Sequence, residues 1–208
     1  MDSLTRFWLI RHGEPAEEAQ GRCYGSLDIG LSAHGRTQIE RVARYLNEEP
    51  IAAVYTSPRL RALESARILG PAGAEIIPDF REIDFGDFEG LCYEEIAARY
   101  PEVYRQWMAA PTEVRFPNGE SFAEMRVRVV QAFDSLRRSR QGQTVAVVTH
   151  GGVIRILIAW ALEIPDRCLF RTGQDYAAMN LLSFIGPCPS VQLLNGRAPE
   201  CGQAQRRG

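Results

Sequence analysis

The sequence contains few cysteines, and their arrangement differs from that of a disulfide-rich or zinc-binding protein. The five cysteines are odd in number, scattered and without a C-x-x-C pair: Cys23, Cys92, Cys168, Cys188 and Cys201. Disulfide frameworks use an even number of cysteines, and structural zinc sites usually take them in closely spaced pairs. We therefore expect neither, and we interpret the chain as a reduced, cytoplasmic protein.

Long hydrophobic runs are also missing. The longest candidate, VIRILIAWAL, is interrupted by Arg155 and is shorter than the roughly 20 residues that a membrane-spanning helix needs. The amino-terminal stretch MDSLTRFWLIRHGE has no cleavable apolar core, because its short apolar run leads straight into charged residues. The sequence thus predicts no membrane span and no signal peptide.

Neither sign of charge is in large excess. The chain contains 24 Lys and Arg against 26 Asp and Glu, and its pI is about 6.0. Proteins that bind nucleic acid or anionic lipid usually carry a strong basic excess, so we expect neither partner. An anionic ligand would have to meet a local cluster of cations.

What is present is the pattern of one α/β domain. No repeat, low-complexity block or linker divides the 208 residues, so we predict one domain over residues 1–195 and a disordered tail over 196–208. Short apolar strand candidates alternate with helical patterns, which predicts a sandwich with a largely parallel sheet. The strand candidates are FWLIR, AAVYTS, EIIP and TVAVVTH, followed by a closing hairpin of MNLLSF and VQLLN.

Two helices have readable starts. Ser57 suits an N-cap and Pro58 a first helical turn in SPRLRALESARIL. In SFAEMRVRVVQAFDSLRR, Ser121 and Glu124 form a capping box. The apolar residues of this second helix recur at helical spacing, and we expect them to face the core.

Three of the predicted strands end in residues that can bind and transfer phosphate. The first ends on Arg11-His12-Gly13, the second leads into a helix that carries Arg61, and the fourth ends on His150-Gly151-Gly152. Parallel strands end at the same edge of a sheet, where ligands bind, and helix N-termini and arginine forks both attract phosphate. The sequence therefore predicts a phosphate pocket with two histidines. The third, His34, is expected to be structural.

Such a pocket can transfer a phosphoryl group. A neutral imidazole can attack phosphorus and form a phosphohistidine, provided that its other ring nitrogen donates to a backbone carbonyl. The leaving oxygen needs a proton, and a carboxyl group beside a phosphate has a raised pKa that lets it carry one. The residues alone do not choose among four acids: Glu82, Asp84, Asp87 and Glu89. Glu14 is expected to anchor the turn after His12.

Six motifs occur in one order along residues 6–185: RHGE, LSAHGRTQ, SPRLRALESA, REIDFGDFEG, GESF and VVTHGG. Together they resemble the histidine phosphatase superfamily, the phosphoglycerate mutase-like proteins. The resemblance implies a three-layer α/β/α sandwich and an activity that needs no metal or cofactor. It also implies a phosphorylated nucleophile at His12, a general acid or base at Glu82, and phosphate ligands at Arg11, Arg61 and His150.

Within that family, GRCYGSLDIGLSAHG and FPNGESFAEMRVRV are most similar to alpha-ribazole phosphatases and related small phosphomonoesterases. The segment before GES is short for a phosphoglycerate mutase, which favours a phosphatase. Pro15 stands where the family usually has Ser or Thr, and Glu18 where an Asn often contacts phosphate. Arg22 and Tyr24 are candidates to replace such contacts, with plain surface positions as the alternative.

The prediction is a cytoplasmic, metal-independent hydrolase of a small-molecule phosphomonoester, with Gly151 beside the phosphate. Four aromatic residues are candidates to contact the leaving group, with burial in the core as the alternative: Tyr93, Trp107, Phe116 and Tyr176. A mutase and a non-catalytic phospho-ligand module are the rival hypotheses, and three histidines without clustered spacing argue against a metal-dependent phosphatase. The sequence names neither the leaving group nor the oligomeric state, and a homodimer is compatible with it.

Overall fold

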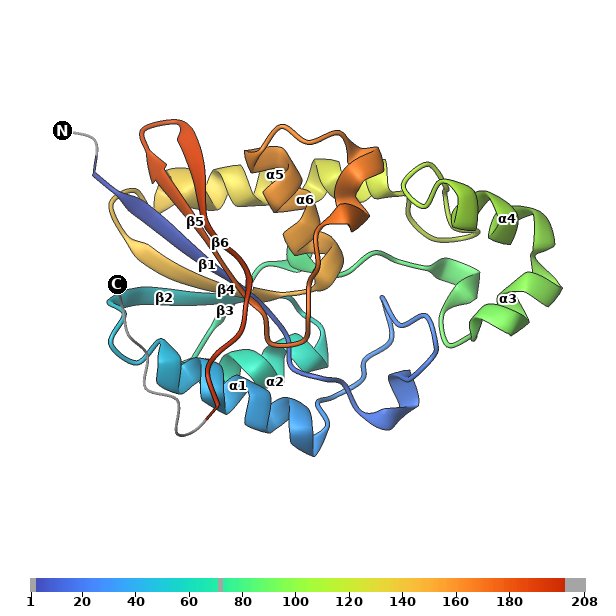
Figure 1. Cartoon of the computed structure of the whole chain (residues 1–208), viewed down its shortest axis with the longest axis horizontal. Helices are drawn as coiled ribbons and strands as arrows, with labels where there is room; N and C mark the ends of the chain where they lie inside the picture. Colours follow the sequence, from blue (N-terminus) through green and yellow to red (C-terminus); the bar gives the residue numbers. More distant parts are fainter. Residues whose placement is uncertain (1–2, 71–72, 201–208) are drawn as a thin grey trace.

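A computed structural model of the chain describes residues 3–70 and 73–200, which form a six-stranded mixed sheet (Figure 1). In spatial order its strands are β3 (Glu75–Ile76), β2 (Ile51–Thr56), β4 (Thr144–Thr149), β1 (Thr5–Arg11), β5 (Met179–Ile185) and β6 (Cys188–Gly196). The strands from β3 to β1 pair in parallel, β5 joins β1 antiparallel, and β6 completes a hairpin with β5. The largely parallel sheet and its closing hairpin are therefore confirmed.

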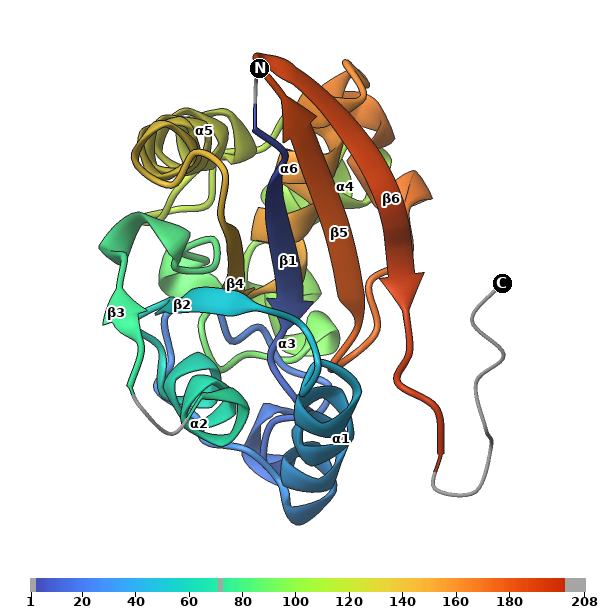
Figure 2. The same ribbon diagram turned by 90° about the vertical axis from the view of Figure 1, so that its left-hand side faces the viewer.

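Helices cover both faces of this sheet, which makes the predicted three-layer sandwich (Figure 2). On one face lie α1 (Ala33–Tyr45) and α2 (Leu60–Leu69), and on the other α5 (Phe122–Ser139) and α6 (Gly151–Ala161). Because side chains alternate along a strand, β1 places Phe7 and Leu9 in one core and Trp8 and Ile10 in the other. The central strands are thus packed from both sides, and their carboxyl ends have little freedom to move.

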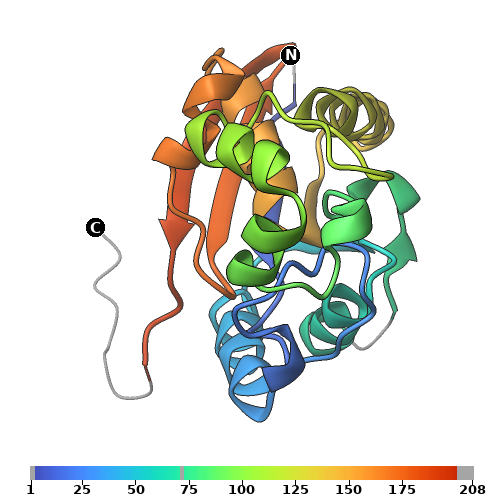
Figure 3. The ribbon, with the colours of Figure 1, turned by 90° about the vertical axis from the view of Figure 1, so that its right-hand side faces the viewer.

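Two short helices extend beyond the carboxyl end of the sheet (Figures 1 and 3): α3 (Tyr93–Arg99) and α4 (Pro101–Ala109). We refer to them as the cap. In an aromatic cluster at its base, the Trp107 ring contacts those of Phe85, Phe88 and Phe116. Short 3-10 turns connect the larger elements: η1 (Glu17–Ala19), η2 (Pro78–Phe80), η3 (Gly86–Phe88) and η4 (Asp166–Arg171). The aromatic cluster fixes the cap to the segment around η3.

The start of α2 differs from the prediction. The helix begins at Leu60, and Ser57 is not its N-cap. The Ser57 hydroxyl lies 2.7 Å from Nε2 of His150, and the Leu60 N–H donates instead to Oδ1 of Asp28 at 2.7 Å. A side chain from a distant loop therefore caps α2, because Ser57 is engaged at the edge of the sheet. The other predicted start is confirmed, since α5 begins with the capping box of Ser121.

The carboxyl-terminal segment is described as far as residue 200. Gly196 closes β6, and the next residue, Arg197, donates to Oδ2 of Asp175 at 2.7 Å. The rest of the tail predicted over 196–208, residues 201–208, lies outside the described residues. Among the helices of the described part, none combines the length and the apolar character needed to cross a bilayer.

Candidate active site

The carboxyl ends of β1 and β4 bring two predicted site histidines together. Arg11 and Thr149 are partners in the register of these adjacent parallel strands, so the residues that follow, His12 and His150, lie side by side. Their ring centroids are 5.2 Å apart. Parallel pairing alone therefore accounts for the proximity of the two imidazoles.

A cavity of about 290 Å³ opens at these strand ends. Six residues predicted for the site line it: Arg11, His12, Arg22, Tyr24, Arg61 and Glu82. The other two are buried next to the lining residues. His150 has no exposed surface, and a Cβ on Gly151 would stand 3.4 Å from Nε of Arg11. The fold thus brings all of the predicted site residues to one place.

His12 is a buried imidazole with a proton on one ring nitrogen and a lone pair on the other. Only 2% of the residue is exposed, and Nδ1 lies 2.7 Å from the backbone oxygen of Gly13. Because a carbonyl oxygen can only accept, Nδ1 carries the proton and Nε2 keeps its lone pair. Burial lowers the pKa of His12 well below its usual value, and the cations of Arg61 and Arg11 lower it further. The imidazole is therefore uncharged at neutral pH.

His150 is oriented by Ser57. The Ser57 hydroxyl accepts the Arg59 N–H, and its own hydrogen is available to Nε2 of His150 at 2.7 Å. Burial, and then the charge of Arg61, lower the pKa of His150 well below its usual value. We assign the Ser57 hydrogen to Nε2, which places the proton of the neutral imidazole on Nδ1; this atom is buried and has no hydrogen-bond partner among the described residues.

Arg61 fixes a loop and still has a donor to spare. Its fully buried side chain donates from the terminal nitrogens to the backbone oxygens of three residues, Leu27, Tyr24 and Gly25, at 2.9, 3.0 and 3.0 Å. Nε of Arg61 and Nε of Arg11 have no partner in the described structure. Together with Nδ1 of His150, three buried donors in this cluster have no protein acceptor. Oxygens of a phosphate group are acceptors of the kind that these donors bind best.

Glu82 is the acid that reaches the cavity. Of the four acids that the sequence offered, all within the described structure, it alone lines the cavity. Its Oε2 accepts the Gly152 N–H at 3.1 Å, and its Oε1 accepts the Ile83 N–H at 3.0 Å. A Cβ on Gly152 would stand 2.3 Å from Oε1, so a larger residue there would displace the Glu82 carboxylate from this position. The carboxylate therefore lies against the first turn of α6, beside His150.

The remaining acids stabilise loops. Asp84, Asp87 and Glu89 accept hydrogen bonds from amide groups of neighbouring segments. Glu14 accepts the hydroxyl of Ser32 at 2.8 Å, which is the anchoring role expected for it. Among the described residues, no group of three or more His, Cys, Asp or Glu side chains is arranged to hold a metal ion.

Two tyrosines from distant segments meet above the arginines. The ring of Tyr24 lies 5.1 Å from the guanidinium carbon of Arg61, and the ring of Tyr176 lies 4.2 Å from that of Arg11. The hydroxyls of the two tyrosines are hydrogen-bonded at 2.7 Å. These cation–π contacts hold each guanidinium in one plane, which favours a fixed set of donor directions.

The loop that departs from the family pattern contributes one charged residue to the cavity. Arg22 lines it and donates to the backbone oxygen of Gly90 at 2.6 Å, with Glu95 at 3.5 Å. Glu18 is exposed on η1 and is not among the lining residues, so it makes no contact of the kind an Asn makes in that position.

The sequence reasoning missed Arg155, which also lines the cavity. Its Nε donates to the backbone oxygen of Thr172 at 3.1 Å, and its guanidinium carbon lies 5.5 Å from the ring centroid of Phe170. Burial, and then the charge of Arg11, lower its pKa. A position four residues after Gly151 on one helix lies on the same face, and that spacing was the available signal.

The outer part of the cavity is aromatic. Tyr93 and Trp107 of the cap stack with ring centroids 5.4 Å apart, and both line the cavity, as do Phe85, Phe122 and Phe170. Of the other aromatic candidates, Phe116 is buried in the core, and Tyr176 lies 5.8 Å from the His12 ring. Of the four aromatic candidates, Tyr93 and Trp107 therefore line the cavity, whereas Phe116 is a core residue.

Several bacterial proteins are similar to this chain in sequence. A bifunctional protein of Mycobacterium tuberculosis is 36% identical over 196 residues, which cover 92% of this chain and 54% of that protein. This chain thus spans about half the length of the mycobacterial relatives that it matches. Phosphoserine phosphatase 1 of Hydrogenobacter thermophilus is 32% identical, with 86% of each chain covered.

Solved structures show the same fold as this chain. The alpha-ribazole phosphatase of Shigella flexneri matches with a TM-score of 0.86 and 27% identity, over 95% of this chain and 100% of that one. The family model described as "Histidine phosphatase superfamily (branch 1)" matches residues 7–197, nearly the whole described part. By its sequence, its fold and the pairing of His12 with His150, this chain belongs to the histidine phosphatase superfamily.

Proposed function

We propose that this protein hydrolyses small phosphomonoesters through a phosphohistidine at His12, without a metal ion. The main support for the proposal is the set of groups that surround the His12 imidazole. A lone pair on Nε2 of His12 lies in a cluster with three unpartnered donors, on Arg11, Arg61 and His150. A nucleophile surrounded by donors is the arrangement that phosphoryl transfer needs.

The reaction proceeds in two steps. Nε2 of His12 attacks phosphorus, the N–P bond forms, and the ester P–O bond breaks. The leaving oxygen takes a proton from Glu82, and Arg11, Arg61 and His150 neutralise charge on the phosphoryl oxygens. Water then attacks the phosphohistidine, gives its proton to Glu82 and releases inorganic phosphate, which regenerates the neutral imidazole.

The outer part of the cavity supports two classes of leaving group. Its aromatic lining from the cap, with Tyr93 and Trp107 stacked, suits an apolar or aromatic group, as the alpha-ribazole phosphatase relative would require. Arg155 suits a group that carries a carboxylate, as the phosphoserine phosphatase relative would require. We place an aromatic or nucleoside-like ester first, because more of the lining is aromatic.

The rival activities belong to the same experiment. Phosphate release should be measured in EDTA for alpha-ribazole 5′-phosphate, phosphoserine, phosphoglycerates, sugar phosphates and nucleotides, with the wild type beside His12→Ala and Glu82→Gln. Turnover that His12→Ala abolishes, together with an acid-labile phosphoenzyme in the wild type, is the expected result. Return of the phosphoryl group to 3-phosphoglycerate in the presence of a bisphosphate would indicate a mutase. A folded wild type without turnover or phosphoenzyme would favour a binding module.

Two further expectations stay predictions. A cytoplasmic location can be tested by fractionating cells that produce the full-length protein. A homodimer can be tested by measuring the mass of the protein in solution by light scattering over a range of concentrations.

A further inference from the structure

We propose that Arg128 and Glu120 are positioning residues for Glu82, and that their ion pair fixes the segment from which this carboxylate projects. The inference rests on the proposed function in one respect, because it takes Glu82 as the proton donor and acceptor. Neither Arg128 nor Glu120 lines the cavity. Each would therefore act through the backbone that carries Glu82 rather than by touching the substrate.

The segment that carries Glu82 is irregular, and side chains from outside it bind its backbone. The turn η2 ends at Phe80, and residues 81–85 belong to no helix or strand. Arg128 donates to three backbone oxygens, those of Asp79, Arg81 and Glu82, at 2.6, 2.9 and 3.2 Å. The hydroxyl of Thr149 donates to the remaining one, that of Phe80, at 2.7 Å. Every carbonyl from 79 to 82 is thus bound by a side chain, although no regular element includes the whole segment.

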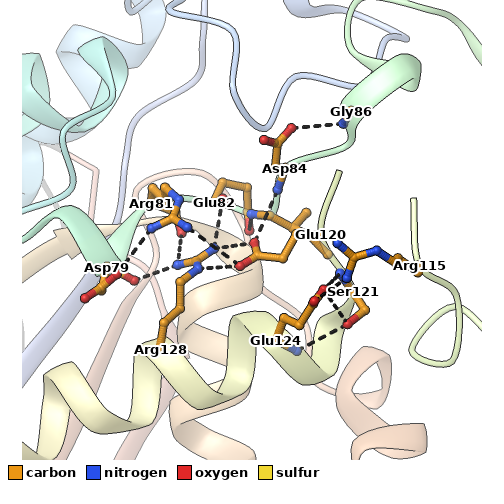
Figure 4. Close-up of polar contacts among 11 residues, drawn as sticks. Asp79, Arg81, Glu82, Asp84, Gly86, Arg115, Glu120, Ser121, Glu124 and Arg128 are labelled. Atoms are coloured by element: carbon orange, nitrogen blue, oxygen red, sulfur yellow. Dashed lines mark hydrogen bonds and ion pairs between the residues drawn. The ribbon is translucent and has the colours of Figure 1, made fainter. Parts of the chain in front are cut away.

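Glu120 completes the arrangement (Figure 4). Nε of Arg128 donates to one carboxylate oxygen of Glu120 at 2.6 Å, and a terminal nitrogen donates to the other at 2.7 Å. Both side chains are only 11% exposed. The backbone N–H of Glu120 also donates to the oxygen of Asp84 at 2.9 Å. Glu82 therefore lies between two anchored points, with Arg128 bound on one side and Glu120 on the other.

The anchors belong to a rigid element. Glu120 immediately precedes the N-cap of α5, and Arg128 lies two turns into that helix, whose apolar face is buried in the core. A forked, bidentate pair between them has one geometry, which a lysine could not reproduce. A functional group held from a helix keeps its position better than one held only by its own loop.

The position of the Glu82 carboxylate matters because it must contact two groups at once. Its carboxylate accepts the Gly152 N–H at 3.1 Å, and it must also reach the leaving oxygen. A displacement of about 1 Å at a reacting group can lower a rate by about 10²-fold. Loss of Arg128 would release three backbone oxygens at once, so the expected effect is on the proton transfer and not on phosphate binding.

The test compares two substrates that differ in their need for a proton. p-Nitrophenyl phosphate releases a stable phenolate, whereas a simple alkyl phosphate releases a basic alkoxide that must be protonated. We expect Arg128→Met to lower kcat/KM by about 10- to 100-fold for the alkyl ester and by under about 3-fold for the nitrophenyl ester. Glu82→Gln should show the same selectivity. Adding Arg128→Met to Glu82→Gln should then cost little more, because the two changes act on one step.

Controls separate positioning from stability. Arg137→Met removes an arginine from the same helix that is similarly buried (17% exposed) and pairs with Asp134 of that helix at 2.8 Å. It should leave both substrates unaffected. Glu120→Gln keeps the shape of the pair, so it serves where Arg128→Met does not fold, and a smaller loss selective for the alkyl ester is expected. Denaturant unfolding of each variant gives its stability separately.

Three results would overturn the inference. Equal losses for both substrates in Arg128→Met and Glu120→Gln would mean that the pair has only a structural role. Full additivity with Glu82→Gln would mean that Arg128 acts elsewhere. Glu82→Gln without any selectivity would remove Glu82 as proton donor, which would refute that part of the proposed function and this inference with it.

Discussion

The inner and outer ends of the cavity are built from different parts of the chain. At the inner end, Arg11, His12 and His150 come from the ends of two paired central strands, and the histidines are buried. At the outer end lie side chains of the cap and η4 together with Arg155 of α6, and two of them are open to solvent: Tyr93 is 44% exposed and Phe170 50%. Residues on packed strands share the rigidity of the sheet, whereas loop residues tolerate change. Under the proposed function, the chemistry therefore belongs to the inner end and the choice of leaving group to the outer end.

The largest effect should follow a change at the inner end. His12→Ala removes the nucleophile and should lower kcat/KM by at least about 10³-fold for every substrate. Inhibition by inorganic phosphate should change little, because the arginines and His150 remain. Steady-state phosphate release provides the measurement, and His34→Ala, on the exposed surface of α1, is the matched control. Near-normal turnover in His12→Ala would mean that the nucleophile lies elsewhere and that the inner end does not perform the chemistry.

A change at the outer end should discriminate between substrates. Arg155→Met should lower kcat/KM about tenfold for phosphoserine, since a charged hydrogen bond of this kind contributes roughly 1.4 kcal/mol. Esters without a second anionic group should be unaffected. Parallel kinetics on phosphoserine and a neutral alkyl phosphate provide the test. Equal losses of kcat/KM for the two substrates would mean that Arg155 acts on the phosphoryl group, which would assign it to the inner end.

The buried histidines should make folding sensitive to acid. Burial lowers the pKa values of His12 and His150 in the folded protein, so below pH of about 6.5 the unfolded chain binds protons that the folded one does not. The free energy of unfolding should therefore fall as the pH drops below that value, by up to about 1.4 kcal/mol per unit for each histidine. Denaturant unfolding between pH 7.5 and 5 should show a shallower slope for His12→Ala than for His34→Ala. Identical slopes would mean that His12 is protonated in the folded state.

The smallest effect is expected where the two ends meet. Tyr176→Phe removes the hydroxyl that bonds Tyr24 but keeps the ring over Arg11. Stability should fall by about 1 kcal/mol, and kcat should change by less than about 3-fold. Chemical denaturation and steady-state kinetics measure the two quantities. A large loss of kcat would mean that the hydroxyl pair contributes to the reaction itself.

The inner end could be predicted from the sequence because parallel topology is simple. Strand ends that carry Arg11-His12 and His150-Gly151 must share an edge, and α2 begins beside them with Arg61. The helices and strands could be predicted because strand and helix patterns alternate along the sequence and because N-cap residues mark helix starts, which are local signals. Ser57 shows the limit, because its local signal as an N-cap lost to a contact with His150 that only the folded sheet creates.

Strand topology did not select two further residues that line the cavity, Glu82 and Arg155. The choice of Glu82 among four acids depends on how an irregular segment is anchored by Arg128, which lies far along the chain. Arg155 lies in an otherwise apolar helix, and the spacing of four residues from Gly151 was its only signal in the sequence. Family resemblance named Glu82 but was silent on Arg155. Contacts between loops have no periodicity to read, so they appear only once the chain is folded.

The pairing of β1 with β4 also affects how the protein acquires its activity. These strands are far apart in the sequence, since β2, β3 and helices α1 to α5 lie between them, so His12 and His150 meet only after a long loop has closed. Contacts of such high contact order form late in folding and slow it. A nascent chain that has not yet emerged beyond β4 therefore contains His12 without His150 beside it. Enzymatic activity should thus lag behind helix formation during refolding and report the completion of the sheet.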